Sequence, residues 1–209
     1  MRKAVCLLSG GLDSYVSLIL SRESLRTILA LTFDYGQRAA KQEIRAAAKI
    51  ASYFKIPHRV IALPWLTDLG DNALTQPEKS LPIFDAEKTA ESARAVWVPN
   101  RNGVFLNIAA AFAESAGAEW ILTGFNKEEA ATFPDNTADY VDRLNRAFEF
   151  STRNQTQVKS FVQAMTKKEM ARILLDWKLP TDLTWSCYDG GKKPCGSCES
   201  CARYENAFS

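Results

Sequence analysis

The sequence predicts an α/β protein: a doubly wound, mostly parallel sheet with a small cysteine-rich module at its carboxyl end. Two observations predict the sheet. Short apolar runs alternate with longer helical patterns, and a glycine-rich turn follows the first run. Strands separated by helices imply parallel βαβ units. A third observation predicts the module, since four of the five cysteines lie between positions 187 and 201. We therefore expect a main domain over residues 1–183 and a module over residues 184–209.

The first half of the chain carries the clearest alternation. Residues 4–8 form a short apolar run, the pattern of a strand that is covered on both faces. The helix that follows opens with Asp-Ser, and a longer alanine-rich helix lies between the second and third apolar runs. The pattern thus predicts strands over 4–8 and 27–33 and within 57–63, and helices over 13–22 and 38–54.

Regular patterns are interrupted between residues 64 and 98, where prolines and polar clusters break any sustained period. We expect this segment to be a long loop over the carboxyl edge of the sheet, where loops carry function. Beyond it, the sequence predicts helices over 104–116, 138–152 and 167–177 and strands over 119–123 and 157–162.

The composition argues against several classes of function. Lys and Arg total 26 and Asp and Glu total 24 in 209 residues, a net charge of +2, whereas binding to a phosphate backbone needs concentrated positive charge. No apolar run approaches the roughly 18 residues of a membrane span. The first apolar stretch is also shorter than the core of a signal peptide. We expect a cytoplasmic protein that binds neither nucleic acid nor membrane.

The turn after the first predicted strand, residues 9–14, reads Ser-Gly-Gly-Leu-Asp-Ser. Its glycines permit positive φ and a close approach of the backbone to a ligand. The helix that begins there offers unpaired N–H groups and the positive end of its dipole, which favours an anion. An ordinary Gly-Gly turn with an Asp or Ser helix cap is the alternative, but the position between strand and helix favours a phosphate loop. Neither the Walker nor the Rossmann pattern occurs in the chain.

Cys187, Cys195, Cys198 and Cys201 have the spacing of metal ligands. In a reducing compartment, such thiolates bind metal more readily than they form disulfides. Four protein ligands leave no open coordination position, so we expect a structural zinc, with an iron–sulfur cluster as the alternative. The remaining cysteine, Cys6, lies in the first apolar run and is expected to be a core residue.

The phosphate loop resembles the pyrophosphate loop of the ATP pyrophosphatases that adenylate carbonyl oxygens. The resemblance implies an adenine nucleotide alpha hydrolase-like fold, cleavage of ATP between its α and β phosphates, and a magnesium ion positioned by Asp13. It also implies that the end of the second strand, near Thr32 and Phe33, faces the adenine. The nucleotide-binding residues that it implies are Leu8, Ser9, Gly10, Gly11, Leu12, Asp13, Ser14 and Phe33.

Further segments match one branch of that superfamily. They are Phe33-Asp34-Tyr35-Gly36-Gln37-Arg38, Val98-Pro99-Asn100-Arg101-Asn102, Thr123-Gly124-Phe125-Asn126, Pro134-Asp135, Met165-Thr166-Lys167, Trp185-Ser186-Cys187-Tyr188 and Pro194-Cys195-Gly196-Ser197-Cys198. In this order they make nearly the whole chain similar to the 7-cyano-7-deazaguanine (preQ0) synthase family. The chain departs from the family pattern at Asn136, where the family often has Cys or Thr, and at Gln163-Ala164, where it often has a proline.

This resemblance implies an ATP-dependent ligase of queuosine biosynthesis that converts 7-carboxy-7-deazaguanine and ammonia to 7-cyano-7-deazaguanine, through an adenylated acid and an amide. It implies ATP, magnesium and zinc as cofactors, and a homodimer. The catalytic residues that it implies are Ser9, Asp13, Arg101 and Lys167, and the substrate-binding residues are Asn100, Arg101, Asn102, Gly124, Asn126 and Asp135. Each has an ordinary alternative, because loop Asn residues often only form turns and Lys167 would simply begin a helix.

Two absences narrow the chemistry. The only histidine, His58, follows Pro57 at an expected strand edge. We expect it to be a structural or surface residue, and no serine motif supports Ser-His-Asp hydrolysis. The chain has no room for a glutamine amidotransferase domain, so we expect nitrogen to arrive as free ammonia.

Two rival functions remain open at this point. One is another adenylating enzyme of the same superfamily that acts on tRNA, which the near-neutral charge does not favour. The other is a non-catalytic zinc-ribbon interaction module on a nucleotide-sensing domain, which would bind ATP without turnover. The loop of residues 9–14 argues against the second, because it suits pyrophosphate release.

Overall fold

The computed structural model describes residues 1–85 and 87–209 of the chain. Within them, five strands form one sheet in the order β3-β2-β1-β4-β5, and every neighbouring pair is parallel. The strands are β1 (Arg2–Leu7), β2 (Leu25–Asp34), β3 (His58–Ala62), β4 (Trp120–Thr123) and β5 (Gln157–Ser160). The order reverses between β1 and β4, and such switch points are where open α/β sheets bind ligands. The doubly wound fold class is confirmed.

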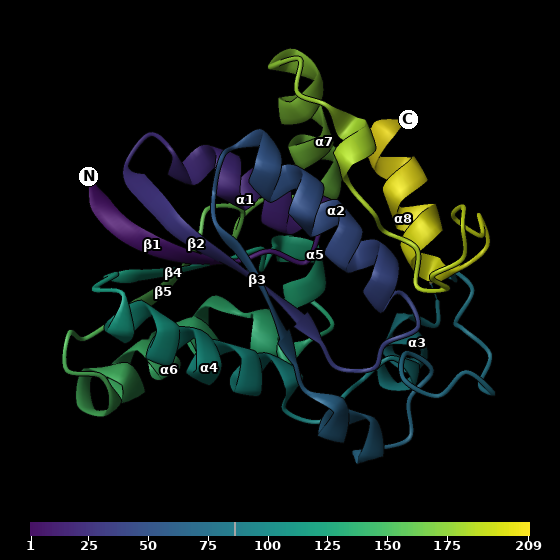
Figure 1. Cartoon of the computed structure of the whole chain (residues 1–209). Helices are drawn as coiled ribbons and strands as arrows, with labels where there is room; N and C mark the ends of the chain where they lie inside the picture. Colours follow the sequence, from purple (N-terminus) through teal and green to yellow (C-terminus); the bar gives the residue numbers. More distant parts are fainter. Residues whose placement is uncertain (86) are drawn as a thin grey trace.

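Helices cover both faces of the sheet (Figure 1). One face carries α1 (Leu12–Ser21), α2 (Ala40–Tyr53), α7 (Lys167–Asp176) and α8 (Glu199–Phe208), and the other carries α4 (Arg101–Ser115) and α6 (Ala138–Ser151). Two short helices, α3 (Thr89–Ala95) and α5 (Lys127–Ala130), lie within connections, as do 3₁₀ turns at Pro64–Asp68, Pro134–Asn136 and Thr181–Leu183. In the described part of the chain, every helix is too short or too polar to cross a bilayer.

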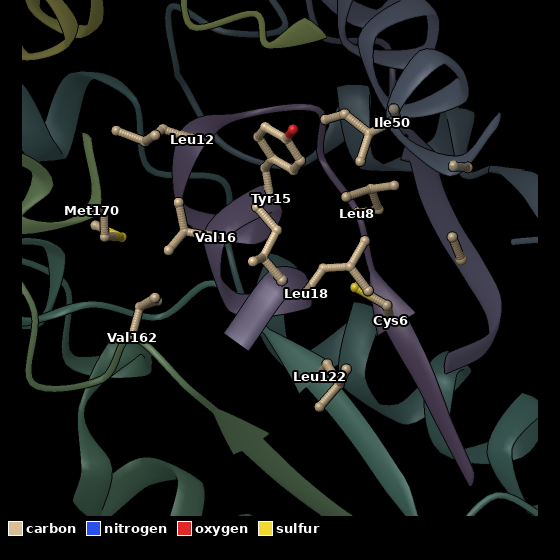
Figure 2. Close-up of a cluster of buried hydrophobic side chains, with 14 of the residues drawn as sticks. Cys6, Leu8, Leu12, Tyr15, Val16, Leu18, Ile50, Leu122, Val162 and Met170 are labelled. Atoms are coloured by element: carbon tan, nitrogen blue, oxygen red, sulfur yellow. The ribbon is translucent and has the colours of Figure 1, made fainter. Parts of the chain in front are cut away.

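The sheet separates two apolar cores. On the α1 face, side chains from β1, α1, α2, β4 and α7 pack together, and Figure 2 shows Cys6, Leu18, Ile50, Leu122 and Met170 in this cluster. Burial raises the pKa of the Cys6 thiol to about 12, so the thiol stays protonated. Cys6 is therefore a core residue, as its apolar neighbours predict. The opposite face of the sheet packs against α4 and α6 in a second cluster.

The connection between β3 and α4 is more regular than its sequence predicts. It contains a 3₁₀ turn at Pro64–Asp68 and the helix α3, which at seven residues is too short to show a hydrophobic period. A fully buried side chain organises the segment between them, because Asn72 Oδ1 accepts hydrogen bonds from the N–H groups of Leu74 and Thr75 at 3.0 and 3.1 Å. The expected long loop therefore contains a 3₁₀ turn and a short helix.

Helix α4 begins at Arg101, earlier than its predicted start at Val104. Asn100 precedes it in the left-handed conformation, with φ 53°. The first turn consists of Arg101, Asn102 and Gly103, none of which is apolar, so the hydrophobic pattern starts only at Val104. The polar turn is free to serve the functional site instead of the core.

Candidate functional site

A cavity of about 300 Å³ opens at the carboxyl ends of β1, β2 and β4, where the strand order reverses. Its lining residues come from the loops after these strands, from helices α1, α2, α4, α5 and α7, and from the cysteine-rich module. The expected site residues that line it are Leu8, Ser9, Gly11, Leu12, Asp13, Ser14, Phe33, Arg101, Asn102, Gly124 and Lys167. The fold therefore brings most of the predicted site together from distant parts of the sequence.

The phosphate loop is held by its own hydroxyl groups. Ser9 Oγ lies 3.1 Å from Ser14 Oγ and accepts a hydrogen bond from the Gly11 N–H at 3.3 Å. The Ser14 hydroxyl donates to the Gly11 carbonyl at 3.2 Å. Within the described part of the chain, no side chain caps the first turn of α1. An uncapped helix start, with the positive end of its dipole, suits an anion.

Two glycines allow other segments to touch this loop. Gly10 has φ +84°, and a Cβ there would lie 2.6 Å from the Glu43 carbonyl oxygen on α2. A Cβ on Gly124, just after β4, would lie 2.6 Å from the Ser14 nitrogen. Only glycine fits such approaches without displacing backbone. Helix α2 and the end of β4 thus position the phosphate loop from two sides.

Lys167 connects the phosphate loop to α5. Its Nζ lies 2.8 Å from Asp13 Oδ2 and 3.1 Å from Glu129 Oε1, and its side chain is only 14% exposed. Burial lowers the pKa of Lys167, but Asp13 and Glu129 together raise it by more than burial lowers it, so the net shift is upward. Lys167 also begins α7, which a Thr166–Glu169 capping box holds in place. The result is a fixed positive charge beside the anion site.

The two carboxylates bound to Lys167 differ in their environment. Burial raises the pKa of Asp13 by more than Lys167 lowers it. Burial also raises the pKa of Glu129, but Lys167 together with Arg203 and Arg101 outweighs it, so the net shift of Glu129 is downward. Asp13 Oδ1 is buried and has no hydrogen-bond partner among the described residues. A free carboxylate oxygen beside a phosphate site is a suitable ligand for magnesium, so the residues present fit that ion.

Arg101 is the second cation of the cavity. Its Nη1 donates a hydrogen bond to the Tyr35 hydroxyl at 3.0 Å, and none of the described residues forms a salt bridge with it. Burial lowers the pKa of Arg101, but its negatively polarised neighbours, Tyr35 and Asp135 among them, shift it upward overall. Lys167 already has two carboxylate partners, so Arg101 is the cation that remains available to an anionic ligand.

Asp135 lies beside Arg101 but does not itself line the cavity. Burial raises its pKa, and the charge of Arg101 and hydrogen bonds from Asn136 and Asn102 offset part of that shift. Asn136 Nδ2 lies 3.1 Å from Asp135 Oδ1, and Asn136 and Asn102 both line the cavity. Asn136 therefore supplies an amide that holds Asp135 in place.

Three other expected residues are absent from the cavity lining. Gly10 faces α2, and Asn100 is an exposed residue before α4. Asn126 is fully buried, and its Oδ1 accepts hydrogen bonds from the N–H groups of Glu128 and Glu129. It thus caps α5, the ordinary role of a loop Asn, although its Nδ2 has no partner among the described residues. Substrate binding by these residues stays a prediction.

The cavity also contains acidic and polar residues that the sequence analysis did not single out. Gln37 Nε2 donates to Glu43 Oε2 at 2.7 Å and to the Phe33 carbonyl at 3.1 Å, and burial raises the pKa of Glu43. Gln37 lies within a segment that matches the family, so that signal was present. Glu43 and Glu129 are helix residues that nothing in the sequence distinguishes from surface acids.

The four predicted cysteine ligands meet at one point. The Sγ atoms of Cys187, Cys195, Cys198 and Cys201 all lie within 4.8 Å of one another, with Cys195 and Cys201 at 3.9 Å. A tetrahedral zinc, with Zn–S bonds of about 2.3 Å, would separate its sulfurs by roughly 3.8 Å. The N–H groups of Asp189 and Cys195 each donate to Cys187 Sγ at 3.3 Å, which stabilises a thiolate. The cluster therefore fits one tetrahedral metal ion.

The module around these cysteines forms part of the cavity. Its lining residues are Trp185, Ser186, Tyr188, Ser200 and Tyr204. The expected boundary between residues 183 and 184 therefore divides a single site, with the phosphate loop on one side of the boundary and a wall of the cavity on the other.

Comparisons with known proteins identify the family of the chain. A family model described as queuosine biosynthesis protein QueC matches residues 3–209. The chain is 48% identical over 211 residues to the 7-cyano-7-deazaguanine synthase of Carboxydothermus hydrogenoformans, covering 99% of this chain and 98% of that one. It is 45% identical over 215 residues to the 7-cyano-7-deazaguanine synthase of Methanosarcina mazei, covering 99% and 93%.

Among solved structures, the fold is similar to that of the U34-tRNA thiolase NcsA from Methanococcus maripaludis, determined with its 4Fe-4S cluster. The TM-score is 0.54 at 16% sequence identity, and the match covers 99% of this chain and 64% of the thiolase. At that identity, the likeness concerns the fold alone.

Proposed function

The chain belongs to the QueC family of queuosine biosynthesis proteins, and from that membership we propose that it converts 7-carboxy-7-deazaguanine to 7-cyano-7-deazaguanine. We infer that the reaction uses ATP, magnesium and free ammonia. The observation that carries the proposal is that one cavity contains both the phosphate loop and Arg101, a cation without a carboxylate partner among the described residues. We also propose that the enzyme is a cytoplasmic homodimer.

In the proposed reaction, an oxygen of the substrate carboxylate attacks the α-phosphorus of ATP, and pyrophosphate leaves. Ammonia then attacks the acyl carbon, and AMP leaves with that oxygen, which gives the amide. The amide oxygen attacks the α-phosphorus of a second ATP. Loss of AMP and two protons forms the nitrile, so both oxygens of the acid leave as part of AMP.

The phosphate loop is suited to the pyrophosphate that leaves. The uncapped first turn of α1 offers its N–H groups, and Ser9 and Ser14 add hydroxyl groups beside them. Lys167, held at 2.8 Å from Asp13, stabilises the negative charge that grows on the phosphates. When bound, magnesium neutralises the phosphate oxygens, and Asp13 would hold it through its unpartnered oxygen.

Arg101 is suited to the substrate carboxylate. A guanidinium binds a carboxylate through two parallel hydrogen bonds and so fixes the attacking oxygen. Asp135, with Asn102 and Asn136 beside it, offers acceptors and donors for the guanine-like edge of the base. Small reorientations of Asp135 toward the cavity would let its carboxylate accept from the amino group.

For the cysteine cluster we propose a structural zinc ion. The four sulfurs supply a complete tetrahedral ligand set and leave no position for substrate. Metal analysis of the purified chain tests this. Zinc at one ion per chain supports the proposal, and iron with acid-labile sulfide would instead support the iron–sulfur alternative.

The decisive experiment is mass spectrometry of a reaction with 7-carboxy-7-deazaguanine, ammonium and ATP–Mg, without RNA. We expect the nitrile mass, and with substrate labelled by ¹⁸O in both carboxylate oxygens we expect the label in AMP. A product without the nitrile mass rejects the assignment. A requirement for tRNA would favour the RNA-modifying rival, and ATP binding without turnover would favour the non-catalytic one.

Replacement of the loop carboxylate provides a matched control. Asp13→Asn should lower kcat by roughly 100-fold or more, the usual effect of losing a charge-stabilising group, because it removes the proposed magnesium ligand. Asp139→Asn, on the exposed face of α6, should leave kcat unchanged. Equal activity of the two variants would remove Asp13 from the mechanism.

A further inference from the structure

The cysteine module touches the phosphate loop through the backbone. The Trp185 N–H donates a hydrogen bond to the Gly10 carbonyl at 2.9 Å, and Gly10 is the loop residue with φ +84°. The Trp185 indole N–H donates to the carbonyl of Cys187, the first cysteine ligand, at 2.8 Å. A short, hydrogen-bonded path therefore runs from the metal site to the backbone of the anion site.

The same segment also docks on the start of α2. Gln42 Nε2 donates a hydrogen bond to the Gly191 carbonyl at 2.8 Å. Arg38 Nη2 forms a salt bridge with Asp189 Oδ1 at 3.7 Å. Gly190 has φ +68°, and a Cβ on it would lie 2.7 Å from the Arg38 carbonyl carbon. These contacts hold the docking segment, residues 185–191, against the helix that also packs on Gly10.

Beyond its docking contacts, the module forms one wall of the cavity. Ser186 Oγ lies 3.4 Å from Ser200 Oγ, which joins the docking segment to α8. The Tyr204 hydroxyl on α8 lies 2.9 Å from Thr184 Oγ1. Tyr188 packs against both the cysteine cluster and the core beneath α4. The wall therefore depends on the same segment that the cysteines hold.

We propose that residues 185–191 position the phosphate loop, so that the metal bound by the cysteines sets the affinity of the chain for ATP. Trp185 and Gly190 are positioning residues in this scheme, and neither needs to touch the nucleotide. The inference rests on the proposed use of ATP. Because binding energies are reciprocal, ATP must tighten metal binding by the same factor by which metal tightens ATP binding.

The first test measures ATP binding by calorimetry, with excess magnesium, to the full chain loaded with zinc, stripped of metal, and reloaded. We expect the dissociation constant for ATP to rise roughly tenfold on stripping, the equivalent of about 1.4 kcal/mol, and to return on reloading. Circular dichroism checks that the α/β core stays folded. ATP should also slow the release of zinc to a chelator. Equal ATP affinity in the loaded and stripped chains overturns the proposal.

A pair of variants keeps the proposal testable if the stripped chain unfolds. Gly190→Ala pushes the docking segment away from Arg38, whereas Gly117→Ala places the same substitution at another positive φ, +62°, with no atom within 4 Å. We expect Gly190→Ala to weaken ATP binding roughly tenfold, whether or not it retains zinc, and Gly117→Ala to bind ATP like the wild type. Wild-type ATP affinity in Gly190→Ala overturns the proposal.

The outcome is separable from that of the proposed reaction. A chain whose ATP affinity depends on metal, but which makes no nitrile, contradicts the reaction and supports this inference. A chain that makes the nitrile with an ATP affinity indifferent to metal overturns this inference alone.

Discussion

Lys167 Nζ lies 2.8 Å from Asp13 Oδ2, although the two residues are 154 positions apart in the chain. Glu129 Oε1 completes the cluster at 3.1 Å. One ammonium group thus pairs with two largely buried carboxylates, one from the phosphate loop and one from α5. The charge balance of the site depends on this single side chain.

Lys167→Met should therefore abolish turnover and destabilise the fold by about 3 kcal/mol, because it leaves two buried carboxylates without a cation. Lys167 lowers the pKa of Glu129 in the folded protein, so Glu129 contributes stability above its unfolded pKa and loses it as the pH falls. In the variant this contribution disappears and both carboxylates favour protonation. Urea unfolding should thus show that the variant loses more free energy of unfolding, relative to the wild type, at pH 7 than at pH 5.

Lys79→Met is the matched control for this variant. It removes a lysine from an ion pair with Asp71, whose side chain is 82% exposed, and such pairs contribute about 0–1 kcal/mol. Equal destabilisation by the two substitutions would show that the Lys167 cluster is no more than a surface ion pair.

Arg101 should act on the acid substrate rather than on ATP. Arg101→Lys keeps the charge but cannot form the bidentate pair of hydrogen bonds with a carboxylate. We expect KM for 7-carboxy-7-deazaguanine to rise roughly 10- to 100-fold, which corresponds to the loss of one charged hydrogen bond. The neutral amide intermediate, supplied as substrate, should be much less affected. Steady-state kinetics with both substrates measures the difference, and Arg172→Lys on the exposed face of α7 is the control.

A different pattern would reassign Arg101. If KM for ATP rises instead, and turnover of the acid and of the amide falls equally, the guanidinium binds a phosphate group. Lys167, with its two carboxylate partners, would then have to release one of them to hold the acid.

Much of this site could be predicted because its signals are local. The loop at residues 9–14 is a run of residue types at a strand-to-helix turn, and the spacing of Cys187, Cys195, Cys198 and Cys201 is itself the metal signature. Apolar runs of the right length predict the strands of a sheet that is covered on both faces. Such features depend on neighbours in sequence, which a single chain displays.

The remaining features depend on contacts that form only in the fold. Glu43 and Glu129 become site residues because α2 and α5 bring them to the cavity, and nothing in their own segments indicates it. Asn126 illustrates the converse. An Asn after a strand is equally consistent with reading a base or capping a helix, and the four-residue helix α5 is too short to reveal which.

His58 offers a direct test of electrostatics, because it is the only histidine in the chain. Burial lowers its pKa below the ordinary value of about 6.5. The unfolded chain then binds more protons than the folded one, so stability should fall as the pH drops from about 6.5 toward the folded pKa. An NMR titration follows a single imidazole signal, and a midpoint at or above 6.5 would contradict the structure.

The hydroxyl of Thr32 links His58 to the start of the phosphate loop. Thr32 Oγ1 donates to the Leu8 carbonyl at 2.6 Å and lies 2.7 Å from His58 Nε2. A hydroxyl has one proton, so the ring must donate from Nε2. Thr32→Val keeps the shape of the side chain but leaves the Leu8 carbonyl and His58 Nε2 without this partner. We expect the free energy of unfolding to fall by roughly 1–3 kcal/mol.

Thr27→Val is the control in the same strand, because Thr27 Oγ1 is buried without a hydrogen-bond partner among the described residues. Removing an unpaired buried hydroxyl should be neutral or stabilising. Both variants place valine in β2, so strand propensity cancels from the comparison. Urea unfolding curves that coincide for the two variants would mean that the hydrogen bonds of Thr32 add nothing to stability. A lower free energy of unfolding in Thr32→Val than in Thr27→Val would identify the Thr32 hydroxyl as a stabilising connection between β3 and the loop that follows β1.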